Sequence, residues 1–169
     1  MKKDISIASA IFLVSLLVGV LVGQWIVISQ PTNGLEAVNI KVDYFYIFAK
    51  NLSTCMIFAL GCGVITVPLL IVQSGAIGIQ AGLWLGLNNP LDKLLVLLLP
   101  HGIIEIPAII ISGALGIKLG KIIISHLRTG ASIKTQVKQL KRYYIAVFIS
   151  LVIAAAIECY ITPYIALWC

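Results

Sequence analysis

Long apolar runs alternate with short polar stretches along the whole chain. Residues 5–29 form the first run, which at ~1.5 Å of helix rise per residue is long enough to cross a bilayer. The other apolar runs cover residues 52–72, 76–87, 94–117 and 143–166. This pattern predicts an all-α integral membrane protein with about five transmembrane helices, built as a single transmembrane domain over residues 1–169.

The third predicted span is short and rich in glycine. Residues 73–75, which read Gln-Ser-Gly, separate it from the second run and are typical of a turn. Its glycines recur every three or four residues and give one helix face on which another helix can pack closely. These glycines are Gly75, Gly78, Gly82 and Gly86. We therefore predict a short spanning helix over residues 76–87, with a re-entrant half-helix as the alternative.

Composition excludes an ordinary soluble domain. Of the 169 residues, 60% are hydrophobic and 11% are charged, and the mean hydropathy is +1.09, whereas soluble domains are nearer half apolar. The net charge of +6 does not indicate nucleic-acid binding, because most of the basic residues flank predicted spans. We therefore expect the chain to lie in the lipid bilayer and to bind no nucleic acid.

The basic residues predict the orientation in the membrane. The segment 118–142 holds seven basic residues and no acidic one, which places it in the cytoplasm by the positive-inside rule. With five spans, Lys2, Lys3 and this segment put nine basic residues inside against three outside. We expect a multi-pass protein of the bacterial cytoplasmic membrane with its N-terminus in the cytoplasm. The basic loop either sets the topology on anionic lipid or docks a cytoplasmic partner.

Two ionisable residues lie inside the fourth apolar run, in the stretch 100–108. A charge near the bilayer centre costs at least ~2.5–3.5 kcal/mol on insertion scales, so such a residue usually faces protein and has a partner. His101 and Glu105 are four residues apart, which places them on one face of a helix. Pro100 and Pro107 flank them and predict that the fourth span is kinked at this point.

Other polar residues are expected at a similar depth. Counting ~1.5 Å per residue puts His101 and Glu158 level with each other, ~12 Å from the outer ends of their spans, with Glu105 one turn deeper. Gln80 of the third span is expected at a similar depth. Asn51 lies near the outer start of the second span, so we expect it on the outer side of these polar residues. The sequence thus predicts a polar pocket that opens toward the outer leaflet.

Three interpretations of His101, Glu105 and Glu158 stay open. These side chains can fix helix packing by bonding to one another. They can also form a catalytic or metal centre, since one His and two carboxylates can hold a divalent metal such as zinc with a position left for water or substrate. The third interpretation is a proton or ion relay built on intramembrane carboxylates. The spacing differs from the H-E-x-x-H signature of zinc proteases.

The same residues carry a resemblance to a known family. The pattern resembles the stage II sporulation protein M-like family of small multi-span membrane proteins, over about residues 48–163. The Pro-His-Gly-x-x-Glu core is its most specific part. The matching features are Asn51 at the start of a span, the glycine-rich third segment, Pro100-His101-Gly102 with Glu105 and Pro107-Ala108, Gly113 and Gly116, and Ala156-Ile157-Glu158 with Pro163.

The resemblance implies one of two settings. Sporulation members act as non-enzymatic scaffolds for wall-remodelling hydrolases during engulfment. Small relatives occur in gene clusters that mature, export and protect against circular bacteriocins, alongside an ATPase, and the short chain with its His/Glu core is similar to this second group. It implies a membrane component of circular-bacteriocin-type peptide maturation, by cleavage or cyclisation, or of export.

The expected partners follow from that setting. They are a hydrophobic peptide substrate, a cytoplasmic ATPase and other membrane subunits, with the glycine faces favouring a homo-oligomer or hetero-complex. Whether the chain is itself an enzyme, such as a metal-dependent intramembrane peptidase or cyclase, stays open. The alternative function is a membrane scaffold without chemistry of its own.

Overall fold

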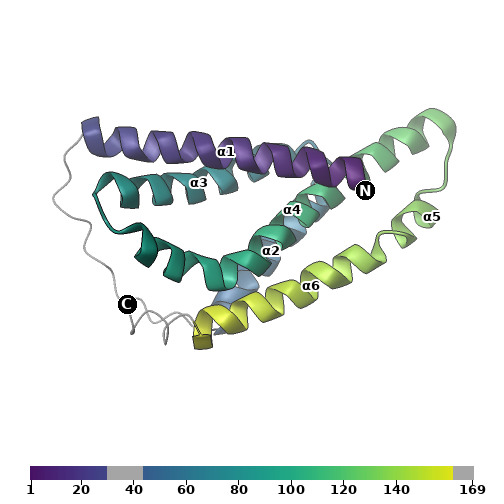
Figure 1. The fold of residues 1–169 in the computed structure, drawn as a ribbon. Helices are drawn as coiled ribbons and strands as arrows, with labels where there is room; N and C mark the ends of the chain where they lie inside the picture. Colours follow the sequence, from purple (N-terminus) through teal and green to yellow (C-terminus); the bar gives the residue numbers. More distant parts are fainter. Residues whose placement is uncertain (30–43, 162–169) are drawn as a thin grey trace.

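The computed structural model describes residues 1–29 and 44–161, and of these the side chains of residues 96–98 and 101 lie outside the description. All the described elements are helices, which confirms the all-α class. The central helix, α4, contacts each of the other described elements and crosses the middle of Figure 1. The elements are α1 (Lys2–Ser29), α2 (Tyr44–Leu60), α3 (Thr66–Gly86), α4 (Leu91–Thr129), α5 (Ile133–Lys138), α6 (Lys141–Ala156) and the π-helix η1 (Ile157–Ile161).

Helix length and composition fit a membrane protein. Within the described residues, 4 helical stretches are long and apolar enough to cross a bilayer, whereas α2 is apolar but has only 17 residues. The 4 stretches are Lys2–Ser29, Thr66–Gly86, Gly102–Thr129 and Ile133–Ile161. The number of crossings and their orientation stay predictions.

Helices α1 and α3 run side by side and in the same direction (Figure 1). Gly19 of α1 lies against Gly78 of α3, and one turn further along both helices Gly23 lies against Gly82. A Cβ on Gly78 would clash with the carbonyl oxygen of Leu16. The absence of side chains at these positions therefore lets the two backbones touch, which is how small residues hold membrane helices together.

The predicted boundary between the second and third spans is wrong. Residues 73–75 lie inside α3, where Ser74 is buried and its hydroxyl donates to the Leu70 carbonyl at 2.7 Å. The chain instead turns at residues 61–65, between α2 and α3. Cys62 and Gly63 have φ angles of 51° and 82°, which a regular helix cannot accommodate.

This α2–α3 turn is held by a buried threonine and by α4. The Thr66 hydroxyl donates to the Phe58 carbonyl at 2.7 Å and accepts from the Gly63 N–H at 3.3 Å. Gly116 of α4 lies directly against the Phe58 carbonyl, and Gly120 lies against the Cys62 carbonyl. The two α4 glycines thus make the room in which the turn packs.

The fourth helix also differs from its predicted bounds of 94–117. It runs from Leu91 to Thr129, so the first half of the predicted loop 118–142 is helical. Gly130 ends it with a φ of 69° and donates its N–H to the His126 carbonyl at 2.8 Å, a left-handed cap that glycine adopts at little cost. The prediction failed because nothing between 118 and 129 breaks a helix except Gly120, which is a packing residue.

Helix α4 contains Pro100 and Pro107 and bends in its first half (Figure 1). Each proline lacks the N–H that would bond to the previous turn, so a bend in this part is the expected result. The last predicted span, 143–166, begins two residues early, with α6 at Lys141, and changes to the π-helix η1 at Ile157. Its end at 162–166, with Pro163, lies outside the described residues, as does the polar stretch 30–43.

An ion pair between a buried aspartate and an exposed lysine joins the start of α1 to the second half of α4. Asp4 is only 4% exposed, and its carboxylate accepts from Lys121 Nζ at 2.7 Å and from the Met1 ammonium at 2.9 Å. Ala8, one turn further along α1, lies near Gly113 of α4, so the two helices run in opposite directions. The start of α1 therefore lies at the same end of the molecule as the basic segment.

Candidate functional site

Glu105 is the centre of the candidate site. It lies half-buried on α4, one turn after the buried Gly102. Its carboxylate lies within electrostatic range of Glu158 of η1 and of the exposed Lys50 of α2, although no ion pair shorter than 4.0 Å joins these described residues. Three elements that are distant in sequence thus place charged groups around Glu105, and we refer to these three residues as the Glu–Glu–Lys cluster.

The π-helix η1 carries Glu158 at the end of α6. Glu158 is half-buried, and η1 follows α6 directly at Ile157. A π-helix widens the turn by one residue and is found frequently at functional sites. The change in helix type occurs at the residue before Glu158, so it sets the direction in which this carboxylate leaves the helix.

Aromatic rings join α2 to α6 and η1. Tyr44 stacks on Tyr160 with centroids 6.2 Å apart, and its hydroxyl donates to the Val152 carbonyl at 3.5 Å. One turn further along α2, Phe48 meets Phe148 edge-on at 5.8 Å. These contacts fix the start of α2, the helix that carries Lys50, against the end of α6 and against η1.

The predicted partner His101 cannot be placed in this cluster. Its backbone belongs to α4, but its side chain lies outside the described residues. Among the described side chains, no group of three His, Cys, Asp or Glu residues could hold a metal ion. The metal set of His101, Glu105 and Glu158, with zinc as the suggested ion, therefore stays a prediction.

The two predicted supporting residues have different surroundings. Asn51 is half-buried on α2, next to Lys50 and one turn before the buried Cys55. Gln80 is exposed on α3, the helix that packs along α1. Asn51 thus lies on the same helix as Lys50 and is partly buried, whereas Gln80 is exposed on a different helix.

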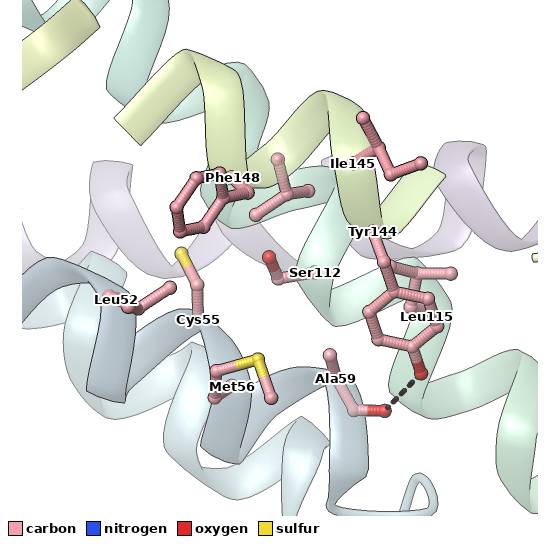
Figure 2. A pocket seen from close by; sticks show the side chains of 10 residues that line it. Leu52, Cys55, Met56, Ala59, Ser112, Leu115, Tyr144, Ile145 and Phe148 are labelled. Carbon is pink, nitrogen blue, oxygen red and sulfur yellow. Dashed lines mark hydrogen bonds between the residues drawn. The ribbon is translucent and has the colours of Figure 1, made fainter. Parts of the chain in front are cut away.

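An apolar cavity lies next to the cluster, between α2, α4 and α6. Its volume is about 300 Å³, and we call it the α2–α4–α6 cavity. Figure 2 shows Cys55 and Phe148 pointing toward each other across it, with Ser112 beside them. Ser112 follows Glu105 by two helical turns on α4, and Cys55 follows Lys50 by five residues on α2, so the cavity lies further along both helices than the cluster residues. The lining residues are Leu52, Cys55, Met56, Ala59, Ser112, Leu115, Tyr144, Ile145, Val147 and Phe148.

The few polar groups of the cavity are already bonded to backbone. The Ser112 hydroxyl donates to the Ala108 carbonyl at 2.8 Å, and the Tyr144 hydroxyl donates to the Ala59 carbonyl at 3.5 Å (Figure 2). The cavity therefore offers an apolar surface, whereas the Glu–Glu–Lys cluster offers charge. With both carboxylates ionised, the cluster carries one more negative than positive charge and can attract a cation.

Lys50 and the cavity are the features that the sequence interpretation missed. Lys50 is one of the three basic residues that the topology places outside, and no other role was predicted for it, although it directly precedes Asn51 at the start of an apolar helix. Phe48, Asn51 and Cys55 follow one another at helical spacing, which could have indicated that this face of α2 points toward protein. The cavity has no sequence signal, because it depends on how three helices diverge.

Comparison with known proteins establishes the family. The family model described as "Stage II sporulation protein M" matches residues 9–163, which include every described residue of the candidate site. This chain belongs to that family. It is also 34% identical over 136 residues to an uncharacterized protein of Methanocaldococcus jannaschii, and the match covers 76% of this chain and 75% of the relative. No solved structure matches the chain.

Family membership and the helix lengths together support a membrane protein. Neither observation assigns a role to a residue, since the archaeal relative is uncharacterized. The Pro-His-Gly-x-x-Glu core lies inside the matched range and supplies Glu105, one of the two carboxylates of the cluster. The function therefore has to be inferred from the chemistry of the site.

Proposed function

We propose that this family member is a five-span protein of the bacterial cytoplasmic membrane, with its N-terminus and its basic segment in the cytoplasm. The helix directions support this topology. Helix α1 runs parallel to α3, as their glycine contacts require, and antiparallel to α4, and α2 runs antiparallel to α6. Alternating directions are what five successive crossings need, and the 17 residues of α2 reach ~25 Å, which a bilayer accommodates by local thinning.

Its proposed role is in circular-bacteriocin-type peptide maturation or export. The Glu–Glu–Lys cluster is the observation that supports it. Intramembrane ionisable residues are expensive and usually serve a substrate or ion. The excess negative charge of the cluster fits the amino terminus or a lysine of a hydrophobic peptide, which would otherwise enter the membrane uncompensated.

Deletion of the gene in a strain that produces such a peptide tests this role. We expect linear precursor to accumulate inside the cell and the mature peptide to disappear from the medium, because the membrane step is missing. Mass spectrometry of the two fractions measures both. Re-expression of the wild-type chain should restore output, and unchanged peptide output together with a sporulation defect would show that the proposal is wrong.

A second candidate function is a membrane scaffold without chemistry of its own. The observation that favours it is the basic end of the molecule, where α4 continues past Lys121 and α5 returns. Two large apolar residues are exposed there, Ile124 at 52% and Leu127 at 77%, among basic residues with no acidic residue in 118–142. Exposed apolar residues surrounded by one sign of charge are typical of a docking surface.

Charge reversal on α5 tests the docking of a cytoplasmic ATPase. The double variant Lys134→Glu and Lys138→Glu should lose co-purification of the ATPase by at least about tenfold, since like charges across an interface are strongly unfavourable. Both side chains are exposed, so folding should not change. The matched control is Lys2→Glu with Lys3→Glu, which makes the same charge change on exposed residues of α1. Equal loss in both variants, or none in either, would contradict docking on α5.

A further inference from the structure

The α2–α4–α6 cavity opens sideways to the outside of the protein. Three of its lining residues are about half exposed: Met56 of α2 at 43%, and Ile145 and Phe148 of α6 at 48% and 49%. Helices α2 and α6 touch on both sides of this opening, through Phe48 with Phe148 and through Ala59 with Tyr144. In a membrane, such an opening faces lipid chains.

The size and chemistry of the cavity suit an aliphatic chain. Its volume of about 300 Å³ is twice that of an engineered apolar cavity of roughly 150 Å³ that stays dry and binds benzene. Water would find few partners inside, because the Ser112 and Tyr144 hydroxyls are bonded to backbone carbonyls. The bilayer supplies acyl chains at high concentration directly at the opening.

A positive charge stands at one end of the opening. Lys141, Ile145 and Phe148 are spaced i, i+4 and i+7, so they form one stripe along α6. Ile145 and Phe148 line the cavity, and Lys141 is exposed one turn before them. The neighbouring Arg142 donates to the Tyr143 hydroxyl at 3.0 Å and lies 4.8 Å from the centre of that ring, so Lys141 is the cation aligned with the cavity.

We propose that this chain binds one anionic phospholipid from the leaflet at its basic end. The lipid phosphate lies on Lys141, and one acyl chain runs along Ile145 and Phe148 into the α2–α4–α6 cavity. Charge complementarity selects an anionic lipid, because the segment 118–142 carries seven basic residues and no acidic one. This site is separate from the Glu–Glu–Lys cluster and does not depend on the role proposed for it.

Native mass spectrometry of the full chain measures the bound lipid. The protein is placed in phosphatidylcholine nanodiscs that contain a minor fraction of phosphatidylglycerol. The protein is then released from the nanodiscs in the mass spectrometer, and the lipid that stays bound to it is identified by its mass. We expect wild type to retain one phosphatidylglycerol in preference to phosphatidylcholine. Lys141→Glu should lower this retention about tenfold, and Lys93→Glu, an equal charge change on an exposed residue near the opposite end of α4, should leave it unchanged.

Filling the cavity tests the position of the chain. Leu52→Trp places a bulky indole ring in the cavity, and Met56→Phe is the second variant if Leu52→Trp does not fold. Either should lose phosphatidylglycerol about tenfold with Lys141 still present. Three results would overturn the proposal: wild type that retains no lipid or a peptide instead, equal effects of Lys141→Glu and Lys93→Glu, or full retention by the folded cavity-filling variant.

Discussion

Gly78→Ala should destabilise the protein by about 1–3 kcal/mol or more, the usual range for forcing an extra methyl group into a packed interior. The new Cβ would overlap the Leu16 carbonyl oxygen and lie 3.0 Å from Gly19 Cα. Both are backbone atoms, so no side chain can rotate away and the two helices must separate. Thermal unfolding in detergent, followed by circular dichroism, measures the loss as a lower midpoint.

Gly75→Ala is the matched control, one turn earlier on the same helix. Its Cβ would find the Ser15 carbonyl oxygen at 3.8 Å as its nearest neighbour, which is an ordinary van der Waals contact. Alanine also has a helix propensity ~1 kcal/mol better than glycine, so this variant should be as stable as wild type or slightly more so. If both variants unfold at the same temperature, α1 and α3 do not pack as closely as described.

The glycine pattern shows what the sequence could and could not predict about packing. The recurrence of Gly75, Gly78 and Gly82 predicted a face for close helix contact, and the structure uses that face. It could not identify α1 as the partner, because Gly19 and Gly23 are only two glycines in a long apolar run. Their role appears only when both helices are aligned in parallel.

The helix break was misplaced for a related reason. Residues 73–75 have the composition of a turn. In α3, however, the Ser74 hydroxyl donates to the Leu70 carbonyl one turn earlier, so the buried serine is hydrogen-bonded and the helix can continue through it. The actual turn, at residues 61–65, lies in an apolar stretch and depends on the positive φ of Cys62. A non-glycine residue rarely adopts this conformation, so Cys62 itself gave no signal, whereas Gly61 and the positive-φ Gly63 beside it were the available indication of a turn.

The candidate site was partly predictable. Depth counting put the two carboxylates within about one turn of each other, and the structure places Glu158 within electrostatic range of Glu105. The same counting placed Gln80 with them, but α3 turns this residue outward because its glycine face belongs to α1. Lys50 was missed, since a lysine near a span end is ordinarily a topology signal.

The second large effect concerns the carboxylates themselves. Glu105→Gln and Glu158→Gln should each lower peptide output by at least about tenfold relative to wild type at equal membrane abundance. A loss of ~1.4 kcal/mol in the interaction between the peptide and the cluster suffices for a tenfold effect. Glutamine keeps the size and hydrogen bonding of glutamate but removes its charge. One remaining carboxylate then balances Lys50, and the cluster no longer attracts a cationic peptide group.

Asp92→Asn is the matched control, because it makes the same acid-to-amide change at an exposed position on α4. It should leave output unchanged. His101→Ala distinguishes the metal interpretation from the others. If the three residues hold an ion, metal content should fall together with peptide output in His101→Ala and in both Glu variants, and metal analysis of all the purified variants measures this. A purely structural trio predicts loss of folded protein instead, since a buried charge left without its partner costs roughly 3–5 kcal/mol. If every variant stays folded and keeps full output, the two carboxylates handle no peptide and the proposed function is wrong.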